Sequence, residues 1–213
     1  MTSAVMKANV DTILDEITAS SDTMWTDTEV YQALADGQNQ VIKRLLAVYR
    51  AKKEANPRTS LSYELETLLN DDTGSTQTVN VPAGFLELIA AYFNFNDTIG
   101  SMLCSIMDNL EEHYFEQDNV YLSATGSKPV AGITSVGDVV KIFFIPTIVG
   151  TGSFSINYLK SPDDIASGTN PTLPVTTHSA IVHYAASRML EKDQRVQEAG
   201  VQYNLFLKEI EGL

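Results

Sequence analysis

Histidine is the residue of this chain best suited to metal binding or proton transfer, and the sequence contains three. His178 and His183 are five residues apart. On an α-helix this spacing turns their side chains about 140° from each other, so both cannot bind one metal ion from the same face. His113 follows Glu111 and Glu112 but lacks the second histidine that a metalloprotease helix requires. We therefore expect no metal site.

The other motifs that could carry chemistry are also incomplete. Cys104 is the single cysteine, which excludes an internal disulfide and a cysteine-based zinc cluster, and its setting in GSMLCSIM is typical of a small hydrophobic residue. No serine lies in a Gly-x-Ser-x-Gly turn, and the glycines of ATGSKP and GTGSFS are not followed by the Lys-Ser/Thr of a phosphate-binding loop. The acid pairs at residues 71–72 and 163–164 are more typical of turns than of a calcium loop. We expect no catalytic residue, no cofactor and no enzyme activity.

Acidic residues outnumber basic ones by 27 to 14, which gives a net charge of −13. A protein that grips nucleic acid through its phosphates needs clustered lysine and arginine, so sequence-specific DNA binding is disfavoured. Residues 9–42 contain seven acids and no base, and a basic cluster follows. Its members are Lys43, Arg44, Arg50, Lys52, Lys53 and Arg58. On one long helix this order complements the helix dipole, and the alternative is a patch that binds a partner.

No run of residues approaches the roughly 18 to 20 apolar residues that a membrane helix needs. Charged residues interrupt the N-terminal stretch MTSAVMKANVDTILDEI, where a signal peptide would have an apolar core. These patterns predict a soluble, unprocessed intracellular protein that is held together by packing or by assembly.

Residues 1–76 have the pattern of an N-terminal helical part. The sequence WTDTE has the residue types of a capped helix start, and apolar residues at helical spacing follow it. We predict a long amphipathic helix over residues 27–55 that ends before an Asn-Pro pair. LSYELETLLN, residues 61–70, predicts a shorter helix that stops at a polar turn over residues 71–75.

Residues 77–162 have the pattern of an antiparallel β-rich insert. TVNVP predicts a short strand closed by proline, and FLELIAAYFNF is either a strand or a buried helical turn. Ile106, Leu110 and Tyr114 lie at four-residue spacing, which predicts one inserted helix over SIMDNLEEHYFEQ. VYLSATG, VVKIFFIPT and GSFSINYLKSP predict further strands, and the GTG of residues 150–152 predicts a hairpin between the last two.

Residues 163–213 begin with a loop rich in turn residues and end in helices. Apolar residues follow one helical face up to Met189 and another after Gly200, which predicts two helices or one helix with a bend near Gly200. We expect these helices to pack with the N-terminal ones. The predicted fold class is α+β, mostly α: a helical bundle with the β-rich insert in its middle, forming a single structural unit.

Four stretches, taken in order, resemble the head-to-tail adaptor (neck connector) proteins of tailed bacteriophages. MWTDTEVYQALADGQNQVIKRLL is similar to the opening helix of that family. TVNVPAGFLELI and KIFFIPTIVGTGSFSINYLKSPDDI resemble its strands interrupted by proline, and LPVTTHSAIVHYAASRMLEKD resembles its Leu-Pro followed by a helix. The resemblance spans most of the chain. It departs at Gly37, in the many acids of the inserted helix, and at the C-terminal end, which lacks the long tail of some members.

The resemblance implies a structural virion protein that forms a ring of about twelve copies, held by contacts repeated from copy to copy. This ring would lie under the portal, join the DNA-filled capsid to the tail and form part of the DNA channel. The implied partners are the portal protein, a tail, stopper or tail-terminator protein, and further copies of the chain. The implied location is the virion neck, after assembly in the host cytoplasm. DNA would pass without specific binding, because an acidic wall repels phosphates.

Two sets of charged residues are candidates for contacts in such a ring. The expected subunit or partner interface consists of Lys43, Arg44, Arg50, Lys52, Lys53, Arg58, Arg188 and Arg195. The acids expected to face the channel, or a basic patch on a neighbour, are Glu111, Glu112, Glu116 and Asp118. For both sets the alternative is an ordinary solvated helix face.

Two other functions remain open from the sequence. A stopper or tail terminator would share the location and the lack of catalytic residues, but such proteins are dominated by β-barrel sequence, whereas this chain is helical at both ends. A small cytosolic helical binding module would use its acidic charge only for solubility.

Overall fold

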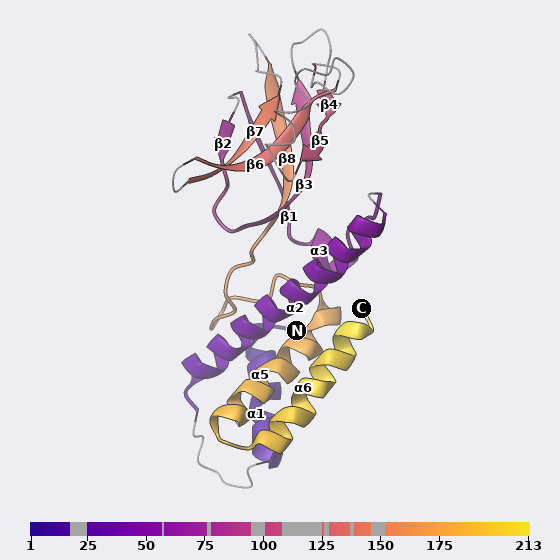
Figure 1. Cartoon of the computed structure of the whole chain (residues 1–213). Coiled ribbons are helices and arrows are strands. Elements are labelled where there is room, and N and C mark those ends of the chain that lie inside the picture. Colours follow the sequence, from indigo (N-terminus) through magenta and orange to yellow (C-terminus); the bar gives the residue numbers. More distant parts are fainter. Residues whose placement is uncertain are drawn as a thin grey trace. The chain divides into compact units, whose positions relative to one another are not determined.

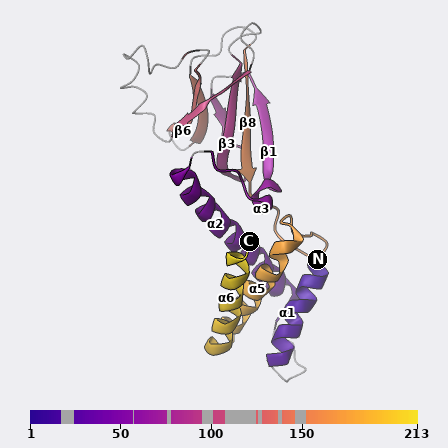
Figure 2. The same cartoon turned by 90° about the vertical axis from the view of Figure 1, so that its right-hand side faces the viewer.

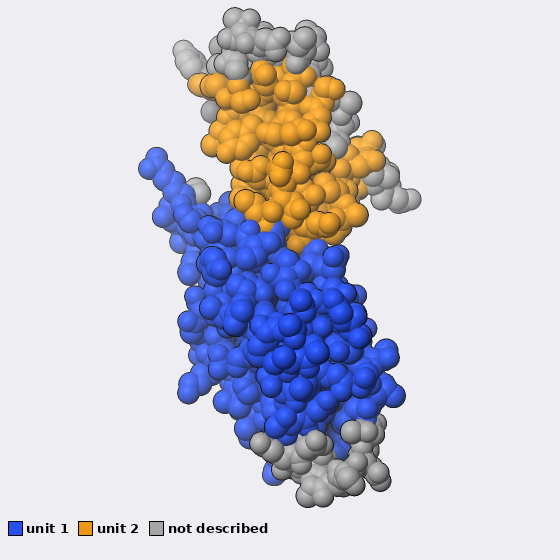
Figure 3. All heavy atoms as spheres, turned by 180° about the vertical axis from the view of Figure 1, so that it is seen from behind, with its two compact units in different colours: residues 1–68, 161–213 blue, residues 69–160 orange. Residues whose placement is uncertain are grey.

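The computed structural model of the chain has an α+β, mostly α fold that divides into two compact units (Figures 1 and 3). The helical unit consists of residues 1–68 and 161–213, and the β unit consists of residues 69–160. The structure describes residues 1–17, 25–56, 58–75, 78–94, 101–107, 125, 128–136, 139–145 and 152–213.

The helical unit is a bundle of helices from both ends of the chain (Figures 1 and 2). Its elements are α1 (Ser3–Ile17), α2 (Asp27–Ala55), α3 (Tyr63–Glu66), the 3-10 turn η1 (Val175–Thr177), α5 (His178–Lys192) and α6 (Val196–Glu211). Helix α5 packs against α1, α2 and α6, and it buries Ile181, Ala185 and Met189 completely or nearly so. The prediction that N-terminal and C-terminal helices pack together is therefore confirmed.

Helix α2 begins and ends where its sequence predicts. The Thr26 side chain accepts a hydrogen bond from the Glu29 backbone N–H at 3.3 Å, and the Glu29 carboxylate accepts one from the Thr26 backbone N–H at 3.0 Å. This capping box satisfies backbone donors that a helix start otherwise leaves unpaired. At the other end, the backbone N–H of Asn56 donates to Lys52 at 2.9 Å and closes the last turn.

Gly37 allows α2 and α5 to approach each other closely. A β-carbon added at Gly37 would lie 2.9 Å from the carbonyl oxygen of Ile181 and 3.2 Å from its Cγ2 atom. The first of these distances is shorter than van der Waals contact, so any larger residue would push the two helices apart. The glycine at which the sequence departs from the adaptor pattern thus has a packing role.

The described strands of the β unit form two four-stranded sheets. The first has the order β1 (Leu69–Gly74), β8 (Ser153–Lys160), β3 (Phe85–Asn94) and β4 (Ser101–Leu103). The second has the order β2 (Thr78–Asn80), β7 (Val139–Ile145), β6 (Val130–Val136) and β5 (Ser105–Met107). The strand pairs are antiparallel except for β5 and β6, which are parallel.

The two sheets share one apolar core. Phe144 of the second sheet stacks on Phe154 of the first, with ring centroids 4.6 Å apart, and also on Phe93 at 6.2 Å. The cluster around these rings draws buried residues from both sheets. Strand β3, which the sequence left open between strand and helical turn, contributes Phe93, Leu88 and Ala91 to this core.

The turn expected over residues 71–75 is wrong. Residues 69–74 form β1, which pairs in register with β8 from Leu69 opposite Leu159 to Gly74 opposite Phe154. As the edge strand of its sheet, β1 leaves Asp71 exposed to water, so acids are tolerated there. Strand β1 also shortens the helix predicted over residues 61–70 to the single turn of α3.

The hairpin expected around residues 150–152 is also wrong. Strand β7 pairs with β2 and β6, whereas β8 pairs with β1 and β3 in the other sheet. Both strands carry an apolar face, and these faces meet across the core through Phe144 and Phe154. Alternating patterns of this kind do not distinguish edge-to-edge pairing from face-to-face packing.

Two further predictions need correction or fall outside what the structure describes. Residues 105–107, expected to begin the inserted helix, form β5, and the rest of that stretch lies outside the described residues. The strand expected over residues 120–126 also lies outside them, except for Thr125, which forms a bridge with Lys128. Strand β6 was not predicted.

The break between the last two helices lies at residues 193–195 and not at Gly200, which is inside α6. Gln194 adopts a left-handed φ of 60°, and the backbone N–H of Arg195 donates to the carbonyl of Leu190 at 2.9 Å. This hydrogen bond is that of a Schellman motif, which ends helices through one left-handed residue. The sequence signal was missed because the left-handed residue is glutamine, where glycine is the usual choice.

Candidate interface surfaces

Within the described residues, no three histidine, cysteine or acidic side chains lie together as a metal site would require. His178 is buried, and its Nε2 atom lies 2.8 Å from the carbonyl oxygen of Leu173, to which it donates. Its Nδ1 atom lies 2.8 Å from the amine of Met1 and therefore accepts. Burial lowers the pKa of His178, so the neutral ring is favoured. His183 instead contacts the side chain of Gln202.

Cys104 lies between β4 and β5, where the chain passes from one sheet to the other. Its backbone N–H donates to the carbonyl of Ala91 at 2.8 Å, and its side chain is buried in the shared core. Burial raises the pKa of its thiol to about 12, so it is protonated at neutral pH. This cysteine acts as a small hydrophobic residue.

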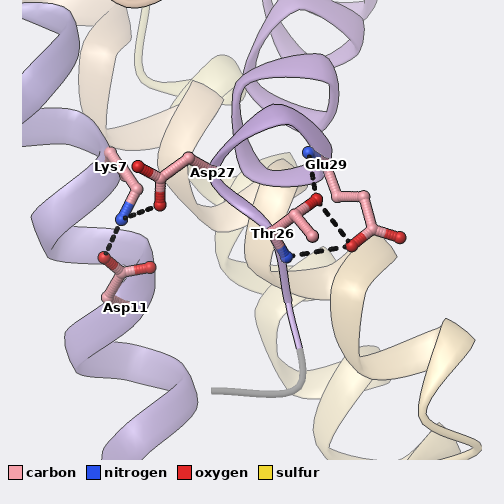
Figure 4. Close-up of polar contacts among 5 residues, drawn as sticks. All are labelled: Lys7, Asp11, Thr26, Asp27 and Glu29. Atoms are coloured by element: carbon pink, nitrogen blue, oxygen red, sulfur yellow. Dashed lines mark hydrogen bonds and ion pairs between the residues drawn. The ribbon is translucent and has the colours of Figure 1, made fainter.

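Charged side chains of α1 and of the first turn of α2 lie close together (Figure 4). Lys7 of α1 pairs with Asp11 of its own helix at 2.7 Å and with Asp27 at 3.0 Å. Both contacts raise the pKa of Lys7. Because Asp27 belongs to α2, Lys7 joins the first two helices of the bundle beside the capping box.

A second cation reaches the same turn from α5. Lys192 pairs with the carboxylate of Glu29, and its Nζ atom lies 5.3 Å from the ring centroid of Trp25. The hydrogen bond from Lys192, helped by the two from Thr26, lowers the pKa of Glu29 to about 2. This contact could not be predicted from the sequence, because more than 160 residues separate Lys192 from Glu29.

The basic cluster predicted from the sequence lies along the C-terminal half of α2 and just beyond it. Lys43, Arg44, Arg50, Lys52 and Arg58 are exposed, and Lys53 is half-buried. Arg44 donates to the hydroxyl of Tyr203 at 3.0 Å and lies 5.5 Å from the ring centroid of Phe206. Arg44 thus links α6 to α2.

The structure does not bring all eight predicted interface residues together. Arg188 and Arg195 lie on α5 and at the start of α6, and each pairs with the acid three residues ahead, Glu191 and Glu198. Arg188 lines the same hollow as Glu29, at the N-terminal half of α2, whereas the basic cluster occupies the C-terminal half. The predicted channel acids Glu111, Glu112, Glu116 and Asp118 lie outside the described residues.

The hollow between α2 and α5 has a volume of about 450 Å³ and is open to solvent. The buried residues Ala33 and Met189 contribute to its lining. The remaining lining residues are Glu29, Gln32, Asp36, Arg188, Glu191 and Lys192. Sequence reasoning missed this hollow, since it forms only where two helices distant in the chain meet.

No described helix is both long and apolar enough to cross a membrane. No curated protein matches the chain in sequence. The family model for the SU10 adaptor protein matches residues 1–213. Because this match covers the whole chain, the protein belongs to the SU10 adaptor family, a family of phage head-to-tail adaptors.

Proposed function

We propose that this adaptor forms a ring between the portal and the tail, where it joins the DNA-filled capsid to the tail and forms part of the DNA channel. The observation that carries the proposal is the match of the adaptor family over the whole chain. The role is structural and needs no catalysis, cofactor or metal. Family membership also favours the adaptor over a stopper, a tail terminator or a cytosolic binding module.

The charge of the chain supports a place in a DNA conduit. A wall that neutralises phosphates would hold DNA by releasing its counterions, whereas a protein with a net charge of −13 repels it. We assign the channel-facing role to Glu111, Glu112, Glu116 and Asp118. DNA then passes without specific binding.

The basic cluster supports contact between copies or with a partner. Lys43, Arg50 and Lys52 are exposed on one helix of a chain that is otherwise rich in acids. A neighbouring copy offers a surface of opposite charge, and complementary surfaces give a contact its specificity. Contacts of unlike surfaces repeat from copy to copy and close into a ring when the rotation allows.

Imaging of the virion neck by cryo-electron microscopy tests the proposal. We expect a ring of this chain between portal and tail, with the four acids facing the channel. Density for another protein at that position would overturn the proposed location, and a ring whose acids face bulk solvent would overturn their assigned role.

Sizing of the purified protein provides a second test. We expect a monomer alone and a ring when the portal protein is added, because self-association should wait until the capsid is filled. A stable, compact dimer would contradict this order of assembly.

A further inference from the structure

The C-terminal half of α2 carries an uncovered ridge. Helix α2 continues past the end of α6 (Figures 1 and 2). Val48, Ala51 and Ala55 are exposed there, with a 48% exposed fraction for Val48. Their spacing of three and four residues places them on one face of the helix. Their small side chains allow another surface to approach the backbone closely, and we call these three residues the α2 ridge.

The charge beside the ridge is positive on balance, because Arg50, Lys52 and Lys53 outnumber Glu54, the exposed acid next to Ala55. The chain has five bases and no acid between Asp36 and Glu54. Lys52 is exposed and directly follows Ala51 of the ridge. Arg44 is also exposed, but it donates a hydrogen bond to the hydroxyl of Tyr203 and so contacts α6 of its own bundle. A partner of the ridge should therefore offer a depression with an acid at its rim.

The hollow between α2 and α5 has these properties. Five charged side chains line it, and four of them pair with each other as Arg188–Glu191 and Lys192–Glu29. The fifth is Asp36, which is exposed and accepts a hydrogen bond from Gln32 at 3.2 Å. Paired charges contribute little net field, so Asp36 gives the hollow its negative charge.

We infer that the α2 ridge of one copy docks in the α2–α5 hollow of a second copy, with Lys52 opposite Asp36. This inference rests on the proposed ring. Ala33 in the hollow and Ala51 on the ridge are 18 residues apart on the same helix, which corresponds to about 27 Å along its axis. The two surfaces are different, so the contact is heterologous and can repeat from copy to copy until a ring closes.

Charge reversal tests the pairing in phage particles assembled with the full-length variant chain. Lys52→Glu and Asp36→Lys should each reduce the amount of chain in the neck at least tenfold, and the double variant should restore it. Lys208→Glu, on the exposed side of α6, is the matched control and should incorporate normally. Thermal unfolding of the purified variants checks that each one folds. Loss in both single variants without rescue in the double variant would overturn the pairing.

Engineered cysteines test the geometry. A chain with Gln32→Cys and Val48→Cys should form disulfides between copies in the neck and give a ladder of dimers, trimers and higher species on non-reducing gels. Either substitution alone should give no ladder. A product that stops at the dimer, or no ladder from a chain that is present in the neck, would overturn the inference and leave the proposed function intact. Absence of the unsubstituted chain from the neck would overturn both.

Discussion

Two glycines lie inside helices of the bundle, and their surroundings predict opposite effects of substitution. At Gly37 an added β-carbon would lie 2.9 Å from the carbonyl oxygen of Ile181, which is backbone and cannot move aside alone. We expect Gly37→Ala to destabilise the protein by about 1–3 kcal/mol, because α2 and α5 must separate, despite the better helix propensity of alanine. Urea unfolding measures the change. An unchanged urea midpoint would mean that α2 and α5 are packed less closely at Gly37 than the structure shows.

At Gly200 the added β-carbon meets nothing within 4 Å. The residue is exposed in α6, so only helix propensity should matter. We expect Gly200→Ala to stabilise the protein by about 0.5–1 kcal/mol in the same urea assay. If the stabilised variant fails to enter the virion neck, Gly200 is required for contact with another molecule and not for folding.

Glu29 makes the stability of the helical unit depend on pH. Lys192 and Thr26 lower its pKa from 4.5 to about 2, so its stabilising contribution is complete above about pH 4.5 and is lost as the pH falls towards 2. Glu29→Gln keeps a capping side chain but removes the charge. We expect lower stability than the wild type at neutral pH and a smaller loss between pH 4.5 and 2, measured by thermal unfolding across pH. Glu209→Gln, which removes one charge from an exposed residue, should leave the wild-type profile in place.

Among the elements, helices could be predicted from the sequence and strand partners could not. The bounds of α2 follow from local signals, namely the Thr26–Glu29 capping box and the polar Asn56 at its end. The strand at β8 was predicted, but its pairing with β1 joins residues 80 to 90 positions apart, which no local pattern encodes. The same limit applies to the interface surfaces. The basic cluster is a continuous run in the sequence, whereas the α2–α5 hollow exists only after folding.

Helix α6 is fastened to the bundle by an aromatic cluster and one cation. Tyr203 and Phe206 contact each other and Tyr184 of α5, and Arg44 of α2 binds both Tyr203 and Phe206. Arg44→Met and Tyr203→Phe remove the same hydrogen bond from its two sides. We expect a coupling energy of about 0.5–1.5 kcal/mol in a double-mutant cycle measured by urea unfolding. Strictly additive effects would show that the bond contributes nothing to holding α6.

At the scale of the whole molecule, the described residues form two cores. The helical unit buries Leu34, Ile181 and Phe206, whereas the β unit buries Phe144 and Ile156. The chain enters the β unit at residue 69 and leaves it at residue 160, so the helical unit is completed by segments from both ends of the sequence. Its folding therefore requires residues 161–213 to return to the N-terminal helices.

Separate cores predict separate responses to core substitutions. Phe206→Ala and Ile156→Ala each remove a fully buried side chain, which costs about 2–5 kcal/mol in the unit that contains it. Trp25 is the single tryptophan and lies at the start of α2, so its fluorescence reports on the helical unit. We expect Phe206→Ala to lower the urea midpoint of Trp25 fluorescence and Ile156→Ala to leave it unchanged. Hydrogen exchange of the β8 amides should become faster in Ile156→Ala and stay unchanged in Phe206→Ala, because those amides open with the β unit. Equal shifts of Trp25 fluorescence and β8 hydrogen exchange in either variant would show that the two units unfold as one cooperative body. The packing of α1 and α2 against α5 would then depend on the β unit being folded.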